Sequence, residues 1–255
     1  MSVNPETAQA RAPRLRLVAS KPRLKKLLEL TSINGELDTI WLRYGPNGIS
    51  QSQVDPSYTM AVIARFSRAY FTEYSTDGEG EVKVPHSIYN VVSKYLKEVD
   101  NIELKVEGDV LALRGRDEVY EGSLLQVELP RIEVDIEERD YGFVPATGTV
   151  RAVYGVDSEE WYIKADEIKI HYGSTLKLTV DLEEGGTYTR GAKVLDRRDV
   201  AGSGTVAVDG KTFRSVVELF TGPIYLVITD AAVILSQRSS DYLVSFILAL
   251  RESAE

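Results

Sequence analysis

Apolar and polar residues alternate with a period of two over most of the chain. The clearest run covers residues 101–129, NIELKVEGDVLALRGRDEVYEGSLLQVEL, and is broken by Glu-Gly-Asp and Arg-Gly-Arg-Asp turns. Residues 223–250 show the same pattern, with reversals marked by Thr-Asp and Ser-Ser-Asp. Residues 38–54 and 59–75 are rich in β-branched and aromatic residues. Alternation interrupted by polar turns predicts antiparallel β-meanders.

Four short stretches depart from this period and show the apolar spacing of helices. The expected helices are residues 21–31, 86–98, 157–168 and 211–221. Short helices cannot cover both faces of long sheets, so we expect the four to lie together on one side.

Two of the strand–helix junctions begin alike. GEVKVPHSIYNVVSKYL starts at Gly80 and GTVAVDGKTFRSVVELF starts at Gly204, and a shift of 124 residues aligns their apolar positions. This similarity indicates an internal duplication. The sequence therefore predicts an α+β protein with two similar domains of antiparallel sheets and two helices each. The expected division is a disordered tail at 1–13, domains at 14–128 and 149–255, and an extended connector at 129–148.

The composition limits the classes of partner. The 255 residues include 39 acidic and 30 Lys or Arg residues, which gives a net charge of −9. This balance argues against a protein that coats nucleic acid with its whole surface, but a local basic surface is still possible. The chain has no cysteine, no long apolar run and no apolar signal-peptide core at its start. Residence in the cytoplasm is the expectation, with no membrane contact.

The acidic chain nevertheless gathers cations on three of the expected helices. On the first, Leu24, Leu27 and Leu28 form the apolar stripe; on the second, the stripe includes Tyr95. The cations project from the opposite faces, where they can line a surface for phosphates; they are Lys25, Lys26, Lys94, Lys97, Lys211 and Arg214. The helix expected at 157–168 buries Trp161 and turns acidic residues outward, so that face is not basic.

Catalytic and metal-binding motifs are missing from the sequence. The two histidines, His86 and His171, show no pairing pattern, and AGSGTVAVDGK lacks the spacing of a phosphate-binding loop. No segment has the Asp/Asn-Gly-Glu spacing of a calcium hand. We therefore expect that the protein is not an enzyme and that it binds no cofactor and no metal ion. A structural β-rich assembly protein stays open as an alternative.

Several stretches resemble the DNA sliding clamps of the proliferating cell nuclear antigen (PCNA) family, in the family's order. LKKLLEL resembles the first helix, NGISQSQVDPSYTMAVIARF the following strand–turn–strand, and VKVPHSIYNVVSKYLK the second helix. DYGFVP is similar to part of the interdomain connector and YLVSFILALRE to the last strand and tail. The likeness spans residues 15–251. Leu250 and Ala232 stand where the family usually has proline, and Asp166 stands where it often has a basic residue.

The resemblance implies a closed ring of three subunits that encircles duplex DNA without reading its sequence. The six cations above would line the hole, and residues 117–125 and 175–183 would be the edge strands joined head-to-tail. The implied partners are a DNA polymerase, a clamp loader and other proteins with a clamp-binding motif. The departures suggest a divergent member, in a homotrimer or a mixed ring. The implied partner-motif pocket consists of Val54, Tyr58, Tyr141, Phe143, Ala232, Leu248 and Ala249.

Overall fold

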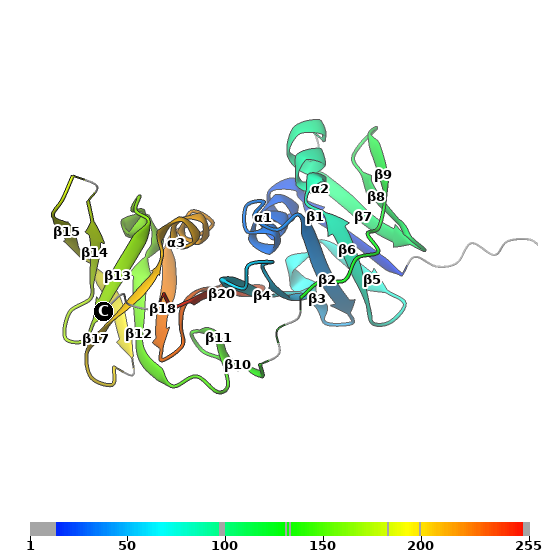
Figure 1. The fold of residues 1–255 in the computed structure, drawn as a ribbon. Coiled ribbons are helices and arrows are strands. Elements are labelled where there is room, and N and C mark those ends of the chain that lie inside the picture. Colours follow the sequence, from blue (N-terminus) through cyan, green and yellow to red (C-terminus); the bar gives the residue numbers. More distant parts are fainter. Residues whose placement is uncertain are drawn as a thin grey trace, which may run out of the picture.

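The computed structural model describes residues 14–96, 100–130, 132, 134–182, 184–198 and 200–251. Its strands far outnumber its helices, and all paired strands run antiparallel. The α+β class and the antiparallel sheets expected from the alternation are thus confirmed (Figure 1). The division into two domains stays a prediction.

The first half of the chain holds nine strands and two short helical regions among the described residues. Its elements are β1 (Leu15–Ser20), α1 (Lys21–Ser32), β2 (Thr39–Gly45), β3 (Gly48–Val54), β4 (Met60–Ser67), a 3-10 turn (Arg68–Tyr70), β5 (Glu73–Thr76), β6 (Gly80–Pro85), α2 (Ser87–Asn90) with a π-helical continuation (Val91–Tyr95), β7 (Asn101–Glu107), β8 (Val110–Arg114) and β9 (Val119–Ser123).

The second half has fewer helical residues. It contains β10 (Ile136–Arg139), β11 (Gly142–Pro145), β12 (Val150–Asp157), a 3-10 turn η3 (Ser158–Trp161), β13 (Glu167–Tyr172), β14 (Lys177–Asp181), β15 (Thr187–Gly191), β16 (Val194–Arg198), β17 (Gly204–Asp209), α3 (Gly210–Val217), β18 (Pro223–Thr229), β19 (Ala232–Arg238) and β20 (Tyr242–Ala249).

One nine-stranded sheet joins the two halves. Its order is β16-β12-β18-β19-β20-β4-β3-β2-β6, and it is flanked by a five-stranded sheet β5-β1-β7-β8-β9 and a four-stranded sheet β15-β14-β13-β17. The halves meet where β20, the last strand, pairs with β4, from Tyr242 opposite Phe66 to Leu248 opposite Met60. Both faces of this seam are covered, by α1 and α3 on one side and by the β10–β11 hairpin on the other (Figure 1).

Helix α1 follows directly from β1 at a proline-containing first turn, where a missing N–H costs nothing. It ends at Ile33, whose left-handed backbone lets its N–H bond the carbonyl of Glu29. Leu24, Leu27 and Leu28 are buried, as the helical spacing predicted.

The second expected helix starts as α2 and widens into a π-helix at Val91. The π-helix changes the phase of the side chains, so Leu96 is buried and Tyr95 is 69% exposed. The inward placement expected for Tyr95 was therefore wrong.

The prediction of a helix at 157–168 was also wrong, because only the single turn η3 forms there. Asp157 caps this turn by accepting a hydrogen bond from the N–H of Glu159. Trp161 is fully buried, but the chain then runs without helix into β13, where Ile168 and Ile170 point into the core with the alternation of a strand.

The connector expected at 129–148 is not extended throughout. Its residues Ile136–Pro145 form the β10–β11 hairpin, which lies on the outer face of the nine-stranded sheet. The buried hydroxyl of Ser245 on β20 accepts a hydrogen bond from the N–H of Phe143 at 2.8 Å, which fixes the hairpin to the sheet.

In the described part of the chain, the five-stranded sheet ends in β5 and β9, and the four-stranded sheet ends in β15 and β17. The expected edge at 117–125 contains β9. The expected edge at 175–183 was wrong, because β14 lies between β13 and β15. Exposed apolar side chains lie on or beside β9 and β15 and include Val110, Val119, Leu182 and Tyr188.

Candidate nucleic-acid interface and partner groove

The two α1 cations expected to contact phosphates, Lys25 and Lys26, differ in their surroundings. Lys25 is partly exposed, with its ammonium 3.6 Å from the carboxylate of Glu29 and 5.8 Å from the centre of the Tyr89 ring. The charge of Glu29 and, less strongly, Tyr89 raise the pKa of Lys25. Lys25 therefore stays charged at neutral pH.

Lys26 has a different environment. Its ammonium donates a hydrogen bond to the main-chain carbonyl of Leu219, just past the end of α3. Burial lowers the pKa of Lys26, against the opposing effect of Glu29. Lys26 thus links α1 of the first half to α3 of the second, and its charge is directed at protein atoms.

The other expected cations lie on α2 and α3. Lys94 is exposed on the π-helical continuation, and Lys211 is exposed in the first turn of α3. Arg214 is half-buried, with its guanidinium 4.0 Å from the carboxylate of Glu218 on the next turn. Lys97 lies outside the described residues. The structure thus brings Lys25, Lys94, Lys211 and Arg214 onto elements that cover the same side of the sheets (Figure 1).

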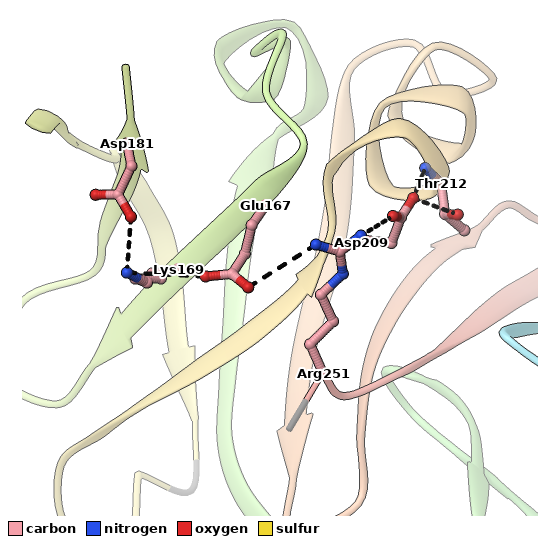
Figure 2. A network of polar contacts seen from close by, with 6 residues as sticks. All are labelled: Glu167, Lys169, Asp181, Asp209, Thr212 and Arg251. Carbon is pink, nitrogen blue, oxygen red and sulfur yellow. Dashed lines mark hydrogen bonds and ion pairs between the residues drawn. The ribbon is translucent and has the colours of Figure 1, made fainter. Parts of the chain in front are cut away.

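A charge network at the start of α3 shows why the neighbouring part of this side is not basic. Figure 2 shows Lys169 between Asp181, at 2.9 Å, and Glu167, at 3.8 Å. Arg251 in turn bridges Asp209, at 2.5 Å, and Glu167, at 3.9 Å. Each cation is paired with two carboxylates, so the network adds no excess positive charge.

Asp209 also caps α3. Its carboxylate accepts hydrogen bonds from the N–H and the hydroxyl of Thr212, both at 2.8 Å. Burial acts to raise the pKa of Asp209, but these bonds and Arg251 outweigh it, so the pKa is lowered. The ionised side chain complements the positive end of the helix.

An apolar groove lies on the opposite, outer side, between β3–β4, the C-terminal strands and the connector. Four residues of the expected pocket line it: Val54, Tyr58, Ala232 and Ala249. Tyr58 is 68% exposed, so its side chain lies at the rim of the groove. Sequence reasoning missed several further lining residues, which are Trp41, Ala61, Pro130, Val134, Pro145 and Ile247.

The remaining three residues of the expected pocket do not line the groove. Tyr141 and Phe143 are buried beneath the connector hairpin, in two small apolar clusters against the outer face of the sheet. Leu248 belongs to the main core. Side chains alternate along β20, so Ile247 and Ala249 face the groove while Leu248 points to the helices.

The two histidines are held by local contacts. His86 stacks on Tyr89 with ring centres 5.7 Å apart, and the ring nitrogens of His171 lie 2.8 and 2.9 Å from the hydroxyls of Thr205 and Thr179. Within the described residues, no three His, Cys, Asp or Glu side chains are grouped to hold a metal ion. No helix of the described chain is long and apolar enough to cross a membrane.

Comparison with known proteins identifies the fold. No protein-family model and no curated protein matches the chain. Solved structures do: PCNA from Entamoeba histolytica, at a TM-score of 0.79 and 13% identity, covers 94% of this chain and 100% of its own.

Two further clamps agree. PCNA from A. fulgidus, in a structure with the C-terminal region of FEN-1, matches at a TM-score of 0.76 and 16% identity, over 94% of this chain and all of its own. PCNA from Thermococcus kodakaraensis matches at a TM-score of 0.76 and 17% identity, and the match covers 93% of this chain and 100% of that protein. The chain therefore has the PCNA sliding-clamp fold, as the sequence resemblance implied.

Proposed function

We propose that this protein is a DNA sliding clamp, which closes with further copies into a ring around duplex DNA and tethers replication and repair proteins. The observation that carries the proposal is the placement of α1, α2 and α3, with their outward cations, on one side of the sheets. The clamp fold supports it. The protein would act by holding DNA and recruiting partners, and not by catalysis.

The sheet topology supports ring closure. Within one chain, five strands of the second half and four strands of the first half join at β20–β4 into a nine-stranded sheet. The five-stranded flanking sheet has β9 at one end, and the four-stranded flanking sheet has β15 at one end. Pairing β9 of one copy with β15 of the next would build a second nine-stranded sheet and cover both edges. This contact is head-to-tail, and such contacts form rings when the rotation closes. Three copies is the number that the resemblance implies.

The charges suit retention without sequence readout. Contacts to phosphates position a protein on DNA but carry no sequence information. Lysine supplies a compact charge on a flexible stem, which suits DNA that must slide. The net charge of −9 would keep DNA away from the rest of the surface.

The outer groove is the proposed binding site for partner proteins. Its lining is apolar, with Tyr58 and Trp41 at its sides, and such grooves anchor the aromatic residues of short peptide motifs. The A. fulgidus clamp binds the C-terminal region of FEN-1. By analogy, we propose that segments of a DNA polymerase, a clamp loader and other proteins with a clamp-binding motif dock here.

The helix surface can be tested with a charge-matched pair of variants. The first replaces Lys25, Lys94, Lys211 and Arg214 with alanine. The control removes four cations that lie over aromatic rings of the outer sheet face; they are Arg43, Arg65, Lys83 and Arg198.

Duplex binding is then measured by fluorescence anisotropy between about 50 and 200 mM salt. Each lost phosphate contact lowers the log–log salt slope by roughly 0.9, so the first variant should lose up to about 3.6 units. The control should keep the parent slope. Equal slopes for both variants would show that the helices do not face DNA. That result would favour the alternative, a structural β-rich assembly protein.

A further inference from the structure

A side-chain contact joins α1 to α2 beside Lys25. The hydroxyl of Tyr89 on α2 donates a hydrogen bond to Oε1 of Glu29 on α1 at 2.9 Å. The same oxygen lies 3.6 Å from the ammonium of Lys25, one helical turn earlier on α1. Lys25, Glu29 and Tyr89 therefore form a triad in which a cation and a hydroxyl compete for one carboxylate oxygen.

The distances show which of the two donors holds this oxygen. A charge-assisted hydrogen bond from an ammonium to a carboxylate is about 2.7–2.9 Å long. Lys169 reaches that distance from Asp181, at 2.9 Å, whereas Lys25 stays at 3.6 Å from Glu29. The carboxylate of Glu29 is thus bonded to Tyr89 and only loosely paired with Lys25, whose side chain is 43% exposed.

The ring of Tyr89 is held in place by its neighbours. It stacks on His86 with ring centres 5.7 Å apart and an angle of 15° between the planes. Gly35, just after α1, leaves room for His86, because a Cβ at Gly35 would lie 2.9 Å from Nε2 of the histidine. Tyr89 is also half-buried and packs against the main core. Packing therefore sets the direction in which its hydroxyl is presented to Glu29.

We propose that Tyr89 is a positioning residue for the DNA contact of Lys25. Its hydroxyl occupies the Glu29 oxygen nearest to Lys25 and keeps the carboxylate from closing on the ammonium. Lys25 then gives up only a weak ion pair when it turns to a phosphate, and Glu29 limits how tightly that phosphate is held. The inference rests on the proposed function and adds to it the groups that set the strength of one contact.

Two single variants should shift the affinity for duplex DNA in opposite directions. Tyr89→Phe keeps the stacked ring but lets Glu29 close on Lys25, so the Kd should rise about two- to fivefold, the effect of one exposed ion pair. Glu29→Gln removes the opposing charge, so the Kd should fall by a similar factor. Both shifts should shrink as the salt concentration in the anisotropy measurement rises, because salt screens exposed charges.

Tyr225→Phe is the matched control. Tyr225 is also half-buried, with the guanidinium of Arg198 5.4 Å from its ring centre, but it packs on the outer face of the nine-stranded sheet. Removing its hydroxyl should leave the Kd for DNA unchanged.

Double variants separate positioning from a structural role. Tyr89→Phe should have no further effect in a Lys25→Ala background, where there is no ammonium to position, or in a Glu29→Gln background, where there is no charge to release. If Tyr89→Phe weakens binding equally with and without Lys25, its role is structural and the proposal is wrong. If the parent binds DNA but the two single variants shift the Kd in the same direction or not at all, the positioning role fails and the clamp proposal stands. If the parent binds no duplex at any salt concentration, both fail.

Discussion

Gly142 lies where the connector hairpin crosses the nine-stranded sheet, and replacing it with alanine should loosen the hairpin. Its φ of 137° is one that residues with a side chain rarely adopt. A Cβ at this position would lie 2.1 Å from the hydroxyl of Ser236 and 2.8 Å from that of Ser245. These hydroxyls are buried and 2.7 Å apart, so neither can swing into solvent.

The magnitude follows from two contributions. Backbone strain at such a φ costs about 1–3 kcal/mol, and overpacking a tight site costs about 1–3 kcal/mol. Gly142→Ala should therefore lower the free energy of unfolding by roughly 2–6 kcal/mol, which urea denaturation followed by circular dichroism will measure. Ser245→Ala removes the acceptor of the Phe143 N–H and should cost about 1–3 kcal/mol.

Gly148→Ala is the matched control. It lies in the same connector, and its Cβ would meet its neighbours only at 3.6 Å or more. This variant should stay within about 0.5 kcal/mol of the parent. If Gly142→Ala unfolds at the same urea concentration as Gly148→Ala, the hairpin does not pack on the sheet as described.

Two further predictions concern α3 and the groove. The folded pKa of Asp209 is below its unfolded value, so its stabilisation is present above about pH 3.9 and is lost as the pH falls through the folded pKa. Asp209→Asn should accordingly be less stable than the parent at pH 7, with the difference shrinking at about pH 2–3, as urea titrations at both pH values will show. A constant difference at every pH would contradict this. Ile247→Lys should raise the Kd for a peptide with a clamp-binding motif roughly tenfold or more by calorimetry, and Val110→Lys, far from the groove, should not.

The alternation of residues was sufficient to predict the antiparallel strands and the fold class. Helix α1 was also predictable, because its leucines repeat at helical spacing. The spacing of Trp161, Ala165 and Ile168 mimics a helix, but Ile168 and Ile170 are alternate residues of a buried strand. A short segment can satisfy both periods, and the pairing of β13 with β17 decides between them.

Other errors came from phase and from long-range pairing. The π-helix at Val91 turned Tyr95 outward, which a uniform 100° projection cannot show. Neighbouring residues of β20 point to opposite faces of the sheet, so Leu248 lies in the core while Ile247 lines the groove. The true edge strand β15 is short and polar, so only the sheet order distinguishes it from β14. Lys26 shows the same limit, because its acceptor is the carbonyl of Leu219, 193 residues away.

Topological retention on DNA tests the proposed clamp most directly. Duplex DNA is attached to a surface by one end, the protein is allowed to thread over the other end, and that end is then capped with a bulky protein. The account predicts that capping after threading greatly slows dissociation, and that this retained fraction survives a high-salt wash, since a closed ring holds DNA without needing phosphate contacts. Removing the cap should release it. Dissociation that is equally fast with and without the cap, and complete in high salt, would contradict the proposal that this chain encircles DNA.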